Sequence, residues 1–381
     1  MSLVFVCVGF MAMLSATTLA IDVGMFMTAR TQAQNAADAG AHAGAVALVF
    51  NSYTDRTPTG PAVTSAINAA IANQVMGHAV SITSADVTFP TDAAGTADRV
   101  KVQVFRTAAK SNPVATLMGT FFGVNTVDVS ATATAEASPA NAMTCVKPFM
   151  IPDKWIENTN DKGQPDGPWT TSTSFDEFDN KGNLLPHPDV YIPAGTTGYT
   201  GYTVANDVGT QLVLRAGTGD QPNPSFYYSW KMPGDIGGNF YRDNIDTCNT
   251  AVISYDPNNA YIMTQEPGDK SGPTLQGIQD LIAKDPNARW DATCRCVKGS
   301  AFGTSPRVFP IPLFNPQYYA EGKANGRGAS FELANFLGFF ADHVDSNGKI
   351  YGIITTIVGV VSDSTGPVSA DLFPKAIRLV Q

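Results

Sequence analysis

Hydrophobic residues dominate the first 21 positions of the chain, and no charge interrupts them. They run from Leu3 through Phe10 to Ile21, and Asp22 is the first charged residue. About 20 such residues match a bilayer core of about 30 Å, so the pattern predicts a transmembrane helix. A cleaved signal peptide is the alternative, because residues 16–20 are small enough for a peptidase. The missing basic n-region and the helical sequence that follows argue against it.

Small side chains recur at helical spacing beyond the apolar segment. Residues 23–50 contain no proline and are rich in alanine, which predicts that the helix continues to about residue 50 and reaches about 70 Å in length. Small residues on one face let another helix or a sheet approach closely. That neighbour is either a second protein or the next part of the same chain. The face consists of Ala29, Ala33, Ala37, Gly40, Ala41 and Gly44.

In residues 51–138 the spacing of hydrophobic positions alternates between that of helices and that of strands, which predicts a small α/β unit. Residues 61–76 have the pattern of a short helix that begins at a proline and stops before a glycine. Residues 98–106 and 127–135 alternate polar and apolar side chains, as half-buried strands do. The apolar residues 114–122 predict another short helix between them. We expect this unit to pack against the outer half of the long helix.

The composition changes again after a linker at residues 137–142. Proline, glycine, asparagine, aspartate and aromatic residues dominate residues 144–381, and no repeat is visible. Helices are predicted at 272–286 and at 329–340. The fold class is therefore α+β: a long N-terminal helix at 1–50, the small unit at 51–138, and one β-rich, disulfide-stapled domain at 144–381. Its predicted strands are 190–192, 211–215, 226–230, 251–254, 307–311, 350–361 and 376–380.

Four cysteines in the distal domain predict disulfides, because an even number in a chain that leaves the cytoplasm usually pairs. Only one residue separates Cys294 from Cys296, so we expect each to bond Cys145 or Cys248 instead, in either of two pairings. A four-thiolate zinc site is less favoured, because such sites usually place two to four residues between paired cysteines. Cys7 lies inside the apolar helix and is expected to be a small packing residue, with lipidation as the less favoured alternative.

The composition and net charge of the chain argue against one class of binding partner. The chain has 44% hydrophobic and 15% charged residues and a formal net charge of −9. It is long enough to bury several cores. An acidic surface without a Lys/Arg cluster repels phosphate, so we do not expect a nucleic-acid partner.

The sequence shows no catalytic motif. A G-x-S-x-G elbow, an H-E-x-x-H pair and a phosphate-binding loop are all missing, and the four histidines are isolated from one another. We therefore expect no enzyme, no cofactor and no small-molecule substrate. The aromatic residues between Tyr191 and Phe240 predict either strand cores or, alternatively, a glycan-binding surface. The oxygen-rich loops 158–167 and 176–183 leave calcium as a weak alternative to simple turns, since neither has the spacing of an EF-hand.

Residues 15–47 resemble the N-terminal segment of TadG/TadE-like Flp (Tad) pilus-assembly proteins. The family carries an apolar helix, an A-I-D-x-G element, an arginine and a Q-x-A-A-D-A run. Here Ala20-Ile21-Asp22-Val23-Gly24, Arg30 and Gln34-Asn35-Ala36-Ala37-Asp38-Ala39 match it. The resemblance covers about the first 50 residues, and the motif residues are Asp22, Gly24, Arg30, Gln34 and Asp38.

The resemblance implies a pseudopilin-like or minor-pilin-like component of Flp pilus assembly. Such a protein would cross the bacterial inner membrane once, with most of the chain in the periplasm, or at the cell surface if it enters a pilus. Its partners would be the membrane and other pilus-assembly or pilin proteins. The alternative role is an anchored adhesin or glycan-binding surface protein. A D-x-S-x-S metal motif is missing, so metal-dependent adhesion is not expected.

Overall fold

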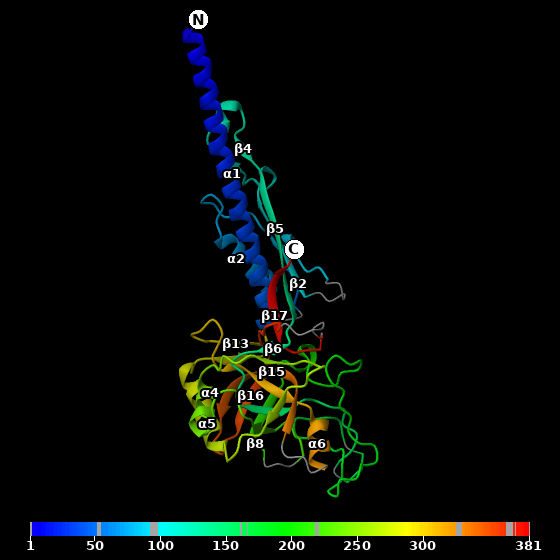
Figure 1. Ribbon diagram of the computed structural model, residues 1–381. Coiled ribbons are helices and arrows are strands. Elements are labelled where there is room, and N and C mark those ends of the chain that lie inside the picture. The colour runs from blue at the N-terminus through cyan, green and yellow to red at the C-terminus, as the bar shows by residue number, and fades with distance from the viewer. Residues whose placement is uncertain are drawn as a thin grey trace. The chain divides into compact units, whose positions relative to one another are not determined.

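The computed structural model divides the chain into two compact units (Figure 1). Unit 1 comprises Met1–Ala137 and Ile377–Gln381, and unit 2 comprises Ser138–Ala376. The last residues therefore return to the unit that contains the first. The described residues are 2–51, 55–91, 98–160, 162–165, 167–217, 221–324, 330–362, 369 and 371–380, without the side chains of 2, 3, 14 and 19.

One continuous helix, α1 (Ser2–Phe50), begins unit 1. Its N-terminal part is exposed, with Phe5 at 75% and Met13 at 73% exposure. The helix is long and apolar enough to cross a membrane. The long apolar N-terminal helix expected from the sequence is thus confirmed.

The second half of α1 is buried against its own unit. A Cβ added at Gly44 would lie 2.7 Å from Cγ1 of Val100, and one at Gly40 would lie 3.0 Å from the carbonyl oxygen of Ala66. Val100 belongs to β2 (Arg99–Arg106), and Ala66 to α2 (Pro61–Ala72). Around Gly40 and Gly44 the small-residue face therefore packs against the next part of the same chain, which is one of the two neighbours expected from the sequence.

A four-stranded sheet completes unit 1, in the order β1-β2-β5-β17. β2 and β5 are antiparallel, from Arg99 opposite Glu136 to Arg106 opposite Val129. Glu136 is buried and pairs with both Arg99, at 2.7 Å, and Arg378, at 3.1 Å. One carboxylate thus holds three strands together. Besides β2, the strands are β1 (Val87–Thr88), β5 (Val129–Pro139) and β17 (Lys375–Val380).

The helix predicted at residues 114–122 is wrong. β3 (Val114–Ala115) instead pairs with β4 (Thr126–Val127), and a 3₁₀ turn, η3 (Gly119–Phe122), lies between them. Gly123 ends that turn at φ 80°, a conformation that favours glycine. The apolar residues 114–122, which have no side-chain cap for a helix, therefore form a tight loop. Two further 3₁₀ turns among the described residues of unit 1 are η1 (Ser84–Asp86) and η2 (Ala108–Lys110).

A closed sheet forms the core of unit 2. The strand order is β11-β15-β14-β7-β9-β8-β16, and β15 also pairs with β16, so six of the strands close into a barrel. β7 with β14 and β8 with β9 are parallel pairs. The strands are β7 (Phe149–Pro152), β8 (Gln211–Ala216), β9 (Phe226–Ser229), β11 (Ile262–Thr264), β14 (Val308–Phe314), β15 (Ser330–Val344) and β16 (Ile350–Thr355).

Helices and short hairpins surround this barrel. Figure 1 shows α4 and α5 side by side next to the barrel. Side chains of α4 and α5, including Tyr241 and Ile278, join the same apolar cluster as Phe149 and Phe339 of the strands. The helices are α3 (Val204–Asp207), α4 (Gly238–Asp246), α5 (Ser271–Lys284) and α6 (Pro316–Ala324). The remaining strands are β6 (Ala142–Met143), β10 (Ile253–Ser254), β12 (Arg289–Asp291) and β13 (Cys296–Lys298).

The helix predicted at residues 329–340 is also wrong, because its described residues belong to β15. Phe336 and Leu337 are both fully buried, in two different apolar clusters. A strand buried on both faces loses its polar–apolar alternation and cannot be distinguished from a buried helix by period. The helix predicted at 272–286 is confirmed as α5.

The expected disulfide pairing is wrong as well. Cys145 bonds Cys248, and Cys294 bonds Cys296. The intervening Arg295 has φ 52°, which bends the chain at the start of β13 and brings the Cα atoms of Cys294 and Cys296 to 5.2 Å. The turn at Arg295 thus lets two cysteines that are separated by one residue bond each other directly.

Candidate functional site

The side chain of Asp22 joins α1 to a distant loop of unit 1. Its carboxylate accepts hydrogen bonds from the backbone N–H groups of Leu117 at 3.1 Å, Met118 at 3.1 Å and Gly119 at 2.6 Å. Asp22 is only 7% exposed. Backbone N–H groups in a tight turn have few partners within the chain, and an ionised carboxylate is a strong acceptor for them. The Asp22 carboxylate thus fixes the loop to the helix.

Gln34 makes a second connection, three helical turns further along α1. Its Nε2 donates to the carbonyl oxygen of Thr132 in β5, at 3.2 Å, and to Oδ1 of Asp38, at 2.9 Å. Asp38 orients the amide, and the amide holds the strand. Three of the five motif residues are therefore used to attach the following fold to α1.

The two other motif residues lie at the surface. Gly24 is exposed, and a Cβ there would meet nothing within 4 Å. Arg30 is exposed beside a groove of about 420 Å³ between α1 and the β4–β5 segment. Both are accessible to a partner. The groove is lined by Val23, Phe26, Met27, Arg30, Val127, Asp128, Val129 and Ser130.

Sequence reasoning identified Asp22 as a motif residue but missed its partners. The signal was the run from Ser111 to Val127, which contains no charged residue. An apolar, charge-free run of this length is unusual for a loop of an acidic chain. The contact to Asp22 itself, across more than 90 residues of sequence, has no local signature.

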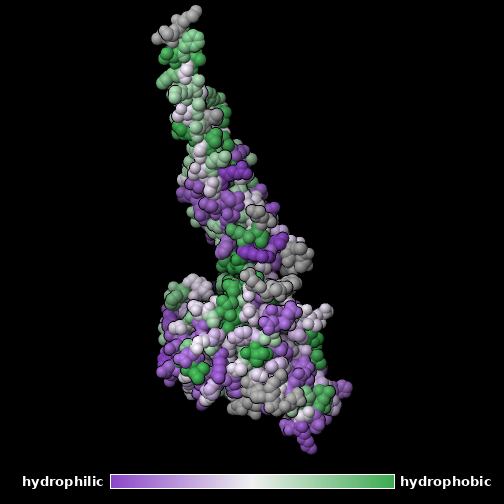
Figure 2. Space-filling view, in the orientation of Figure 1, coloured by the Kyte–Doolittle hydropathy of each residue, from purple (hydrophilic) through white to green (hydrophobic). Residues whose placement is uncertain are grey.

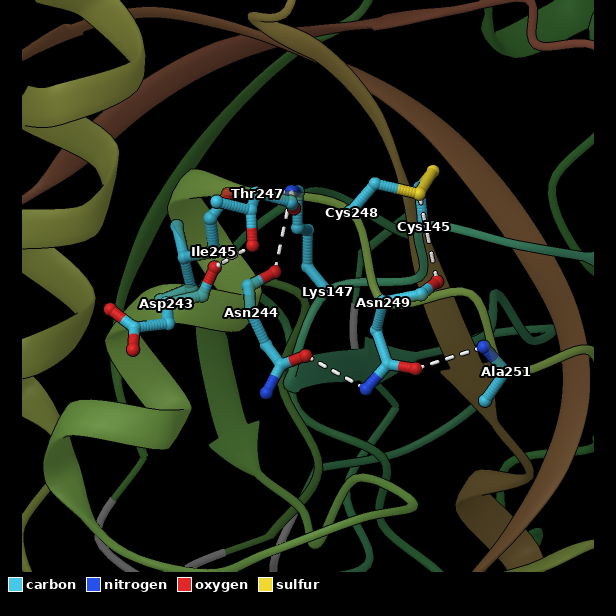
Figure 3. The surroundings of a disulfide bond; sticks show 9 residues. All are labelled: Cys145, Lys147, Asp243, Asn244, Ile245, Thr247, Cys248, Asn249 and Ala251. Carbon is cyan, nitrogen blue, oxygen red and sulfur yellow. Dashed lines mark hydrogen bonds between the residues drawn. A yellow bond between two sulfur atoms is a disulfide. The ribbon is translucent and has the colours of Figure 1, made fainter.

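In unit 2 the long-range disulfide lies next to a buried lysine (Figure 3). Lys147 donates from Nζ to the carbonyl oxygens of Asn244 at 3.3 Å, Ile245 at 2.5 Å and Thr247 at 2.8 Å. These carbonyls belong to the C-terminal end of α4, where they lack helical partners. Burial lowers the pKa of Lys147 to about 7, although the charge of Asp246 opposes this shift. Lys147 and the disulfide together hold the end of α4.

A buried carboxylate organises the loops of unit 2. Asp153 is fully buried and accepts hydrogen bonds from Tyr191 Oη at 3.1 Å, Tyr199 Oη at 2.9 Å and the backbone N–H of Tyr202 at 3.0 Å. Burial raises its pKa to about 6, against these hydrogen bonds. The tyrosines are used inside the fold, which indicates a structural role for the carboxylate.

Most of the aromatic stretch lies in the core. Tyr202 and Trp230 are at most 1% exposed, and Tyr228 is 2% exposed with its ring beside those of Phe314 and Phe331. These rings cannot stack on a glycan at the surface. The structure thus favours the strand-core interpretation of this segment.

A polar cavity of about 760 Å³ opens in unit 2. Its described lining includes Tyr199, Tyr255, Asp256, Glu332 and Asp371, but no histidine, cysteine, lysine or arginine. General acid–base catalysis most often uses a histidine, and nucleophilic catalysis needs a base next to the nucleophile. The lining does hold one hydroxyl beside a carboxylate, since Oγ of Ser369 donates to Oδ2 of Asp371 at 3.1 Å, but no histidine lies among the described lining residues.

The two oxygen-rich loops use their side chains in turns. Oδ1 of Asn160 accepts from the backbone N–H groups of Lys162 and Gln164, and Oδ1 of Asp179 accepts from those of Lys181 and Asn183. Residues 161 and 166 of the first loop lie outside the described residues. Across the described part of the chain, no group of three or more His, Cys, Asp or Glu is placed to hold a metal ion.

Comparison with known proteins gives a match for the N-terminal segment. Neither a curated protein nor a solved structure matches the chain. A Tad family model, described as Flp pilus-assembly TadE/G-like, matches residues 1–47. It covers the apolar part of α1 and all five motif residues, and it associates the chain with Flp/Tad pilus assembly. Together with the apolar helix it fits a membrane-anchored protein, and the N-terminal segment, residues 1–47, is thus similar to the TadE/G-like Flp pilus-assembly family.

Proposed function

We propose that this chain is a membrane-anchored component of Flp/Tad-type pilus assembly that acts by protein–protein contacts, as a minor pilin or an assembly factor. The observation that carries the proposal is the Tad match over residues 1–47. Because the match suggests a structural or assembly role, we propose that the chain performs no catalysis. The α1 helix would anchor it in the bacterial inner membrane.

The two disulfides support a periplasmic location for unit 2. Disulfides form and persist in oxidising compartments, including the bacterial periplasm. The bond from Cys145 to Cys248 joins residues that are 103 positions apart and closes the loop between them. Its reduction would release this large loop. We propose that α1 crosses the membrane once and leaves the rest of unit 1 and all of unit 2 on the periplasmic side.

Exposed motif residues supply the surface for partners in this proposal. Arg30 is charged, exposed and next to a groove, and arginine is enriched at protein–protein contacts. The small-residue face further along α1 is occupied by α2 and β2. We therefore propose that pilus-assembly partners contact the Arg30 groove rather than that face.

The test is fractionation of cells that carry a C-terminally tagged copy. Signal in sheared surface filaments supports a pilus subunit, and signal in washed inner membranes supports an assembly factor. A soluble product shortened by about 20 residues would instead show a cleaved signal peptide and refute the anchor.

A charge-reversal pair tests the partner surface. Arg30→Glu should lower the number of assembled pili, whereas Lys101→Glu, at an exposed position of β2, should not. Equal pilus counts in both variants would contradict a role for the Arg30 groove. Membrane levels of both variants serve as the control for folding and insertion.

A further inference from the structure

The loop held by Asp22 is strongly apolar and exposed. Phe121 is 81% and Phe122 is 65% exposed, and Leu117 and Val124 are 57% and 49% exposed. Between Lys110 and Asp128 the sequence has no charge. Soluble proteins rarely display such a contiguous apolar patch without a partner. These four side chains are called the apolar loop below.

Contacts along α1 place the apolar loop near the membrane segment. Thr132 contacts Gln34, Val127 lies in the same groove as Phe26, and Gly119 contacts Asp22. The segment from η3 to β5 therefore runs along α1, and η3 lies nearer the N-terminus of the helix than β5 does. Figure 1 shows the segment that leads into β4 beside the N-terminal half of the helix.

The level of Asp22 corresponds to the edge of a bilayer. Residues Val4–Ile21 precede it without a charge. At about 1.5 Å per residue they span about 27 Å, close to the roughly 30 Å of a hydrocarbon core. Asp22, and the loop that it holds, would thus lie where α1 leaves the lipid.

The apolar surface of the loop continues that of the helix. Ile21 and Val23 are 43% and 44% exposed, and Met27 is 65% exposed. Figure 2 shows hydrophobic residues gathered over this end of unit 1. Aromatic side chains are enriched at membrane interfaces, where one end is apolar and the other contacts water.

We infer that the apolar loop inserts into the headgroup–acyl boundary of the lipid bilayer, as a second membrane contact beside α1. The occupant of this surface is lipid, because the surface is continuous with the one that spans the membrane. Asp22 is the positioning residue, since its carboxylate satisfies three backbone N–H groups that would be costly to leave unpaired at such a boundary. The inference rests on the anchoring part of the proposed function and not on the pilus role.

The experiment measures the surroundings of nitroxide labels on the full chain in phosphatidylcholine vesicles. Cys7 is free and is replaced by Cys7→Ala, so that single labels can be attached in Phe121→Cys, Phe10→Cys and Lys101→Cys variants. Position 10 reports on α1, and position 101 is an exposed site of unit 1. Oxygen concentrates in lipid, whereas a charged nickel chelate stays in water.

We expect the labels at positions 121 and 10 to collide several-fold more often with oxygen than with the nickel chelate. The label at position 101 should collide more often with the nickel chelate. A label at 121 that behaves like the one at 101, while position 10 reports lipid, overturns the inference alone. A label at 121 shielded from both reagents shows packing against a second copy and also overturns it. If position 10 reports water, the anchor itself fails.

A second pair of variants tests the positioning role of Asp22. Asp22→Ala should move the label at 121 toward water and leave the label at 10 unchanged. Asp38→Ala, which alters a contact to Gln34, should change neither. An unchanged label at 121 in Asp22→Ala would refute the role of Asp22, provided that circular dichroism shows the same helix content as the parent.

Discussion

The carboxylate of Asp22 lies 2.6 Å from the backbone nitrogen of Gly119, which follows it by 97 residues. Replacing Asp22 by alanine leaves three backbone N–H groups without this acceptor. We expect unit 1 to lose about 1–3 kcal/mol of unfolding free energy, and amide hydrogen exchange at Leu117–Gly119 to become faster. Asp38→Ala is the control, with a smaller loss. Unchanged exchange at the three amides would show that the contact does not form in solution.

Two glycines of α1 should respond in opposite directions to alanine. At Gly44 the new methyl group would lie 2.7 Å from Cγ1 of Val100, and overpacking of this kind costs about 1–3 kcal/mol. At Gly24 the space is open, and alanine in a helix interior gains about 0.5–1 kcal/mol over glycine. Thermal unfolding in detergent should therefore show a lower Tm for Gly44→Ala and an equal or higher Tm for Gly24→Ala. A fall in both would contradict the packing described for Gly44.

The two disulfides should differ in their effect on stability. Cys145 and Cys248 are 103 positions apart, and in the loop-entropy account such a bond contributes about 4–5 kcal/mol. Cys294 and Cys296 are 2 positions apart, so the same account gives roughly 1–2 kcal/mol. Denaturant unfolding of the double serine variants Cys145→Ser/Cys248→Ser and Cys294→Ser/Cys296→Ser compares them directly. Equal losses would favour a local structural role over chain entropy.

Glu177 should make the stability of unit 2 depend on pH. Burial raises its pKa to about 7, and repulsion from Glu321 adds to this, while the hydrogen bond from Gln317 opposes it. Between the ordinary pKa of 4.5 and about 7, the folded state binds more protons than the unfolded state. The contribution of Glu177 is therefore fully present below pH 4.5 and is lost as pH rises to about 7.

Glutamine at position 177 cannot ionise, so the Glu177→Gln variant does not lose stability as pH rises from 4.5 to about 7. We expect the free energy of unfolding of the variant to be about 1–3 kcal/mol higher than that of the parent at pH 8 and similar to it at pH 4. Asp179→Asn is the matched control, because hydrogen bonds from Asn183 lower the pKa of Asp179. That variant should be less stable than the parent at pH 7, and the difference should shrink as pH falls below about 4. Chemical denaturation across pH measures both, and a pH-independent difference for Glu177→Gln would contradict the raised pKa.

Elements with a clear period could be predicted from the sequence. α1 and the β2–β5 pair were expected, because each buries one face and exposes the other over many residues. β15 was predicted as a helix, since burial on both faces removes the alternation. The disulfide pairing depends on the backbone of Arg295, at φ 52°, and residue spacing alone does not reveal it.

The candidate site could be predicted only in part. The motif residues were visible because a family resemblance marked them, but the partners of Asp22 and Gln34 come from a strand and a loop about 100 residues away. Such contacts are set by how α1 packs on its unit, which a local pattern does not record. Lys147 and Asp153 are buried charges whose partners are likewise remote in sequence.

The return of the chain to unit 1 in β17 changes how load is carried between the units. Unit 2 is an insertion between β5 and β17, which are neighbours in one sheet. A pull on unit 2 is shared by two covalent connections, and Arg378 of the returning strand pairs with Glu136 of β5. One proteolytic cut at either connection would leave the other intact. The same arrangement makes unit 2 exchangeable as a cassette, because a short turn between β5 and β17 could replace it without breaking the sheet.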